Sequence, residues 1–191
     1  MYIKFGKTNR RNPFIKLVLV GLVAFSVLHL VSAEVNENDK MLNQTAPEMQ
    51  YLITYSKDNR PAATLTNLVG KPHLVFFWSP ASWNSLTLVA DLNLLYDNYR
   101  KQGLEIVGCQ SPGYQFEIDN GETLSNIKSY GFDFPVIVDD GWKTYRSYKS
   151  TTWPMIYLTD QNGVIQRVFK GEIEYQQLDK ALKEVLGEPQ I

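Results

Sequence analysis

The feature that most constrains the fold is an unbroken apolar run, HLVFFW at residues 73–78, followed by a long amphipathic segment and a second apolar run. A continuous run of aromatic and β-branched residues is typical of a strand buried on both faces of a sheet. Residues 85–102 predict a helix, because their apolar side chains recur at helical spacing and Gly103 ends the pattern. The second strand is expected at residues 104–109. Strand, helix and strand with short joints form a unit whose strands are parallel, which predicts an α/β fold.

A hairpin and a closing helix follow this unit. Asn162-Gly163 lies between apolar runs at residues 155–159 and 164–169, and Asn-Gly in that setting is the strongest short-range signal of a β-hairpin. The other expected elements are a strand at 49–55, a helix at 122–130, a short strand at 135–138 and a helix at 174–186. The sequence therefore predicts a central mixed sheet with helices on both faces.

The first 33 residues have the pattern of an export signal. Five lysines and arginines lie near its start, the first acidic residue of the chain is Glu34, and residues 17–28 are largely apolar. Val31-Ser32-Ala33 then places small residues at a cleavage site, as in a secretory signal peptide. An uncleaved membrane anchor is the alternative, but a spanning helix needs about 20 apolar residues, and residues 17–33 include His29. We expect cleavage after Ala33 and export to the periplasm or the outer face of the cytoplasmic membrane.

The rest of the chain is acidic and divides into a polar tether at residues 34–45 and a domain at residues 46–188. Without the signal, 20 acids stand against 14 lysines and arginines, a net charge of about −6. This balance argues against nucleic acid as a partner, and membrane contact is expected only through the N-terminal segment if it stays uncleaved. One histidine and one cysteine, Cys109, provide no ligand set for a metal, and no cofactor is expected. We interpret Asp139-Asp140 and the acids of residues 117–119 as solvated loop charges.

The stretch FFWSPASWNSL, residues 76–86, resembles the active-site turn of the extracytoplasmic thioredoxin-like proteins of cytochrome maturation and of the DipZ type. In that family a buried strand ends in tryptophan and a Cys-x-x-Cys motif, commonly Cys-x-Asn-Cys in the DipZ type, opens the long helix. Here the motif is Ser82-Trp83-Asn84-Ser85. The segments GLEIVGCQSPGYQFE and YKSTTWPMIYLTDQNGVI also resemble the family, and the second implies a cis-proline at Pro154. The resemblance implies a thioredoxin-like fold over residues 46–186.

The chemistry that the resemblance implies needs two sulfurs, and both positions are serine. A helix N-terminus lowers the pKa of the first cysteine from about 8.5 to roughly 3.5–7.5. Its thiolate attacks a disulfide, and the second cysteine resolves the mixed disulfide. A serine hydroxyl does not ionise near neutral pH and forms no disulfide, so the sequence predicts that Ser82 and Ser85 are inactive, with Ser82 as a helix N-cap. Serine hydrolysis would need a base, and the nearest histidine, His73, begins the preceding strand.

Three interpretations of the function remain open. The first is a redox-silent protein that binds an extracytoplasmic protein or peptide segment. The resemblance implies a substrate groove at Trp83, Asn84, Thr152, Trp153 and Pro154. The two tryptophans either belong to the core or form an exposed pair that binds a partner strand. The second interpretation is a thiol-disulfide oxidoreductase represented here with its cysteines substituted. The third is a peroxiredoxin-like enzyme that uses Cys109, for which the competing interpretation is a small apolar residue finishing a buried strand.

Overall fold

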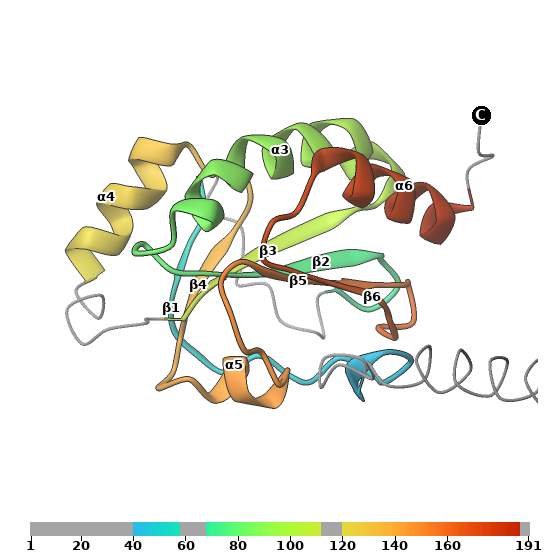
Figure 1. Ribbon diagram of the computed structural model, residues 1–191, viewed down its shortest axis with the longest axis horizontal. Helices are drawn as coiled ribbons and strands as arrows, with labels where there is room; N and C mark the ends of the chain where they lie inside the picture. The colour runs from blue at the N-terminus through green and yellow to red at the C-terminus, as the bar shows by residue number, and fades with distance from the viewer. Residues whose placement is uncertain (1–39, 58–67, 112–119, 188–191) are drawn as a thin grey trace, which may run out of the picture. The chain divides into compact units, whose positions relative to one another are not determined.

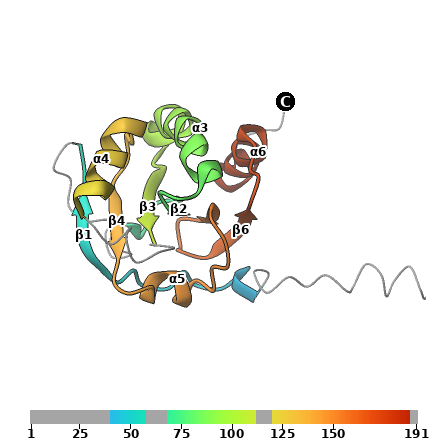
Figure 2. The same ribbon diagram turned by 60° about the vertical axis from the view of Figure 1, so that its left-hand side comes forward.

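The computed structural model describes residues 40–57, 68–111 and 120–187, and its strands form one six-stranded mixed sheet (Figure 1). The strand order is β1-β4-β3-β2-β5-β6. The strands are β1 (Tyr51–Tyr55), β2 (His73–Trp78), β3 (Glu105–Gln110), β4 (Val136–Asp139), β5 (Met155–Thr159) and β6 (Ile165–Lys170). The helices are α3 (Trp83–Tyr99), the short 3₁₀ turn η2 (Arg100–Gln102), α4 (Asn120–Tyr130), α5 (Lys143–Ser147) and α6 (Tyr175–Leu186). Helices α3, α4 and α6 cover one face and α5 the other (Figures 1 and 2), which confirms the predicted fold class.

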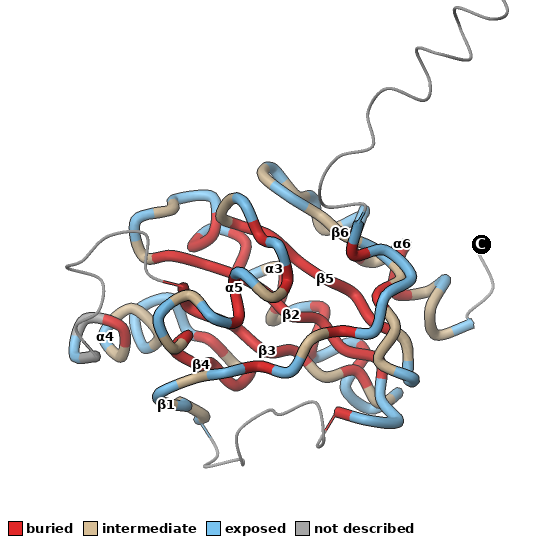
Figure 3. The backbone as a smooth tube through the Cα atoms, turned by 90° about the horizontal axis from the view of Figure 1, so that it is seen from below, coloured by how far each residue is buried: buried red, intermediate tan, exposed pale blue. Residues whose placement is uncertain are grey.

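The central strand β2 explains why the run at residues 73–78 is apolar throughout. It pairs in parallel with β3 and antiparallel with β5, and all six of its residues are buried (Figure 3). Alternate side chains of a strand point to opposite faces. Accordingly Phe76 and Trp78 join the core under α3 and α6, whereas Val75 and Phe77 join the core on the α5 side. One strand therefore supplies two hydrophobic cores.

The long helix α3 begins two residues before the predicted start, because Ser82 caps it. The Ser82 backbone is extended, with φ −96° and ψ 102°, and its hydroxyl accepts a hydrogen bond from the N–H of Ser85. The helix then tightens into η2 and ends at Gly103, whose φ of 98° lies in the left-handed region that glycine adopts readily. The motif thus stands at the start of a helix that directly follows the central strand.

The sequence prediction missed helix α5, and the prediction that Asp139 is a solvated loop charge is wrong. Asp139 is 2% exposed, and its carboxylate accepts hydrogen bonds from the N–H groups of Thr144 and Tyr145, both at 2.9 Å. It also accepts the hydroxyl of Ser111 at 3.0 Å. A five-residue helix is too short to show a periodic pattern, and this buried carboxylate holds its first turn instead. The acids of residues 117–119 lie outside the described residues.

Residues 40–45 are the described part of the polar tether expected at residues 34–45, and they contact the sheet. Met41 is 4% exposed and belongs to the core on the α5 side. The N–H of Asn43 donates to the carbonyl of Ile165 at 2.8 Å, and Thr45 forms an antiparallel bridge with Val164. Contacts with the sheet therefore begin before residue 46. The predicted signal segment lies outside the described residues, and within residues 40–57, 68–111 and 120–187 no helix is long and apolar enough to cross a membrane.

Candidate functional site

Ser82 joins the start of α3 to the segment before β5. Its hydroxyl accepts the N–H of Ser85 at 3.3 Å and donates to the backbone carbonyl of Trp153 at 3.1 Å, 71 residues further along the chain. The Trp153–Pro154 peptide bond is cis, and Pro154 is buried. The structure therefore brings the first motif serine and the proline segment into direct contact. Both hydrogen-bonding roles of the Ser82 hydroxyl are occupied.

Ser85 lies in a different environment. It is 0% exposed, and its hydroxyl oxygen has no hydrogen-bond partner in the part of the chain that the structure describes. A buried polar group without a partner costs about 1–3 kcal/mol. A thiol is a weaker hydrogen-bonding group and behaves as a small apolar side chain, so burial at this position suits cysteine better than serine. The second motif position is therefore a buried environment without a hydrogen-bond partner among the described residues.

The two tryptophans of the expected groove differ in exposure. Trp83, the first residue of α3, is 70% exposed, and its neighbour Asn84 is also exposed. Trp153 is half-buried, and its ring stacks on Tyr145 with centroids 5.1 Å apart and meets Trp142 edge-on at 5.9 Å. Thr152 is half-buried as well. Trp83 is therefore largely exposed, whereas Trp153 is partly packed against other aromatic rings.

Sequence reasoning missed the residues that support Trp153. Tyr145 lies on α5, and burial raises its pKa to about 12. Trp142 precedes the same helix in the left-handed region, with φ 68°, and Arg146 lies over its ring at 5.9 Å. No periodic pattern marks these residues in the sequence. The available signal was the local density of aromatic residues between residues 142 and 157.

Cys109 is a buried thiol on β3, the strand that pairs in parallel with β2. It is 0% exposed, its sulfur lies 3.8 Å from the Ser111 hydroxyl, and burial, with a smaller contribution from the negative charge of Asp139, raises its pKa well above the ordinary value. A protonated, inaccessible thiol is a poor nucleophile. His73 stands at the opposite end of β2 from the motif, so the structure does not bring it to Ser82. Among the residues described, no group of three or more His, Cys, Asp or Glu side chains could hold a metal ion.

A helix that follows the central buried strand, and whose first turn contacts a proline segment at the start of β5, defines a thioredoxin-like protein. Residues 42–168 match the model of the AhpC/TSA family, and the chain belongs to that family. The expected resemblance to thioredoxin-like oxidoreductases is confirmed.

Two relatives share similar sequence with this chain, and one of them is named for thiol-disulfide chemistry. Thiol-disulfide oxidoreductase ResA of Oceanobacillus iheyensis is 27% identical over 192 residues, which cover 97% of each chain. Protein DipZ of Mycobacterium bovis is 26% identical over 146 residues, 75% of this chain, and the chain spans only 21% of DipZ.

Solved structures show the same fold. The thioredoxin-like superfamily protein SPOA0173 superposes with a TM-score of 0.68 at 19% identity, covering 76% of this chain and 97% of that one. A putative thiol:disulfide interchange protein DsbE from Chlorobium tepidum gives 0.67 at 18% identity, covering 76% and 98%.

Proposed function

We propose that the chain is an exported, redox-silent relative of the thiol-disulfide oxidoreductases that binds an extended segment of an extracytoplasmic protein. The observation that carries this proposal is the state of the two motif serines. The Ser82 hydroxyl is engaged by Ser85 and Trp153, and the Ser85 hydroxyl is buried. Neither supplies the thiolate that exchange requires.

Binding requires no sulfur. The first turn of α3 presents backbone N–H groups and the positive end of the helix dipole. The exposed Trp83 stands beside them, and aromatic anchors of this kind commonly dominate binding energies. An extended segment pairing with the backbone near Trp153 would add main-chain hydrogen bonds. Without covalent trapping we expect a reversible complex with a micromolar dissociation constant, about −8 kcal/mol.

The redox part of the proposal is tested by insulin reduction in the presence of a reductant. The unmodified protein is expected not to accelerate the reaction, and the double variant Ser82→Cys, Ser85→Cys is expected to accelerate it. The single variant Ser82→Cys is the matched control, because it has no resolving cysteine at the second position. Activity of the unmodified protein that disappears in Cys109→Ala would refute the silent site and favour the peroxiredoxin-like interpretation.

The binding part is tested with Trp83→Ala, because truncating the half-buried Trp153 would also disturb its packing. A partner recovered from envelope extract by the unmodified protein should bind Trp83→Ala more weakly by about 2 kcal/mol. Val69→Ala is the matched control, because Val69 is 74% exposed and lies outside the groove. If Trp83→Ala and Val69→Ala recovered the partner equally well, Trp83 would not be part of the binding site.

A second candidate, an oxidoreductase represented with its cysteines substituted, is favoured by one observation. The unpartnered Ser85 hydroxyl occupies a position that suits a thiol. Inspection of the encoding DNA or of close relatives would distinguish this candidate from a naturally silent protein. The burial and raised pKa of Cys109 weigh against the third candidate, the peroxiredoxin-like enzyme.

A further inference from the structure

A cavity lies away from the motif, between the end of β1, helix α4 and the segment that leads into β4. Its volume is about 460 Å³. This falls within the roughly 300–1,000 Å³ of typical small-molecule sites. None of its lining residues belongs to the groove of the proposed function. We propose that this cavity, here called the α4 cavity, binds a small amphiphilic monoanion with an apolar tail and one carboxylate.

The floor of the α4 cavity is apolar and continuous with the core. Phe132 and Phe134 line it, are 5% and 2% exposed, and have ring centroids 5.4 Å apart. Tyr55 and Ile127 form half-buried walls that pack against the same core cluster. An apolar tail placed here would exchange water for aromatic and aliphatic surface, which is favourable in proportion to the area buried.

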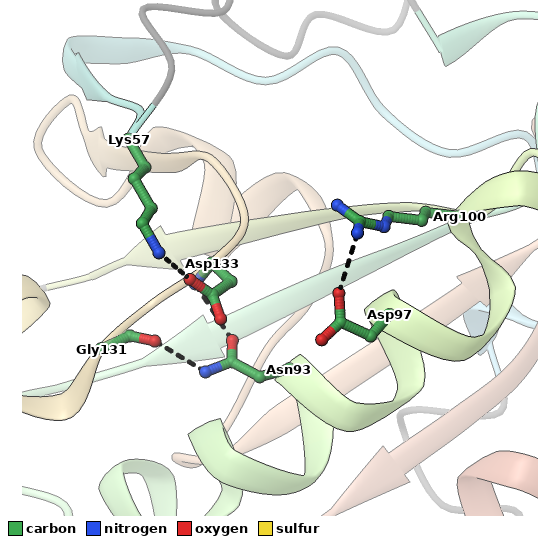
Figure 4. A network of polar contacts seen from close by, with 6 residues as sticks. All are labelled: Lys57, Asn93, Asp97, Arg100, Gly131 and Asp133. Atoms are coloured by element: carbon green, nitrogen blue, oxygen red, sulfur yellow. Dashed lines mark hydrogen bonds and ion pairs between the residues drawn. The ribbon is translucent and has the colours of Figure 1, made fainter.

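The walls are held in place without a ligand. The side-chain amide of Asn93, on α3, donates to the carbonyl of Gly131 at 2.6 Å and accepts the N–H of Asp133 at 3.0 Å (Figure 4). Lys57, two residues after the end of β1, donates to the Asp133 carboxylate at 2.7 Å. Three segments of the chain are thereby fixed relative to one another. A preformed site loses little affinity to ordering on binding.

The charges around the cavity select the sign of the ligand. Lys57, Lys128 and Asp133 line it, so the lining carries one net positive charge. The Lys57 ammonium is paired with Asp133, whereas the Lys128 side chain forms no ion pair or hydrogen bond within residues 40–57, 68–111 and 120–187. Lys128 is exposed on α4, and its flexible stem allows the ammonium to meet an anion at the mouth. An apolar floor with one uncompensated cation matches a tail that ends in a single carboxylate.

The test is calorimetric titration of the full chain with octanoate, with octanol and octylammonium as probes of the same tail and different charge. We expect octanoate to bind most tightly and octylammonium most weakly. Lys128→Gln should weaken octanoate about threefold and leave octanol unchanged, because an exposed charge contributes modestly. Lys180→Gln, an exposed lysine on α6, is the matched control and should change neither.

A second variant locates the ligand. Ile127→Trp fills the cavity and should weaken both octanoate and octanol at least tenfold, whereas Val69→Trp adds the same ring at an exposed position elsewhere and should have no effect. Equal binding of the three probes, or full octanoate affinity in Ile127→Trp, would overturn the proposal. Binding to phosphatidylglycerol vesicles without binding of octanoate would also overturn it, since the charged surface would then recognise a membrane.

Discussion

Replacing Ser85 with alanine tests whether the second motif position carries an energetic penalty. The Ser85 hydroxyl is fully buried and has no partner among the described residues. Removing it recovers a desolvation cost of about 1–3 kcal/mol. The loss of one small atom from a packed site offsets part of that gain. We expect Ser85→Ala to raise the free energy of unfolding by about 1 kcal/mol.

Ser82→Ala is the matched variant and should have the opposite sign. It removes the N-cap of α3, worth about 1 kcal/mol. It also leaves the Trp153 carbonyl without the hydroxyl that now donates to it at 3.1 Å. Together these losses should lower the free energy of unfolding by about 1–2 kcal/mol.

Urea unfolding at neutral pH measures both changes, with the slope checked for constancy so that a midpoint shift reports stability. A destabilised Ser85→Ala would refute the reasoning, because it would mean that the hydroxyl forms a stabilising hydrogen bond. A neutral Ser82→Ala would remove the argument that this serine ties the helix start to the proline segment.

Three further predictions concern residues of the sheet and of the α5 side that stabilise the fold. Gly108→Ala should lower the free energy of unfolding by about 1–3 kcal/mol in the same assay, because its Cβ would lie 3.2 Å from Val136 Cγ2, 3.3 Å from Phe134 Cε2 and 3.4 Å from Trp78 Nε1. Asp139→Ala should cost about 2 kcal/mol or more and weaken near-ultraviolet circular dichroism from the aromatic rings on α5; an unchanged spectrum would contradict the role of this carboxylate in holding the helix. Burial lowers the pKa of His73 below its ordinary value of 6.5, although the Lys71 carbonyl and the charges of Asp160 and Glu105 oppose the shift. The His73 side chain therefore binds a proton more readily in the unfolded chain than in the folded one, and the free energy of unfolding should fall as the pH drops below 6.5. His73→Gln should flatten this pH dependence, measured as urea midpoints between pH 7.5 and 5.5.

The sequence was informative where one physical effect dominates a long segment. The buried strand β2 and the amphipathic helix α3 were predictable, because burial on two faces and on one face leave different periodicities. Helix α5 was not, since it depends on Asp139, whose charge suggested solvent while the fold buries it. Because helix α5 was not predicted, the packing of Trp153 on Tyr145 was not predicted either. Only the tertiary structure brings these two side chains together. Sequence reasoning thus located the motif and missed the aromatic residues that pack against Trp153.

Ser82 and Ser85 lie in different environments, and this difference allows a last test. The test asks whether the two serines replaced cysteines while their surroundings stayed unchanged. Ser82 donates to the Trp153 carbonyl and caps α3, and a thiol is a weak donor that performs both roles less well. Ser85 makes no such contact within the described chain, and a thiol there avoids the cost of a buried unpaired hydroxyl. With a reductant present, Ser82→Cys should therefore lower the free energy of unfolding by about 1 kcal/mol, whereas Ser85→Cys should be neutral or stabilising. If both single variants were stabilising, neither serine would be adapted to its position, and the interpretation as a recently substituted oxidoreductase would be favoured. Opposite signs would indicate that the first position has acquired a structural role of its own, through the cap of α3 and the hydrogen bond to Trp153.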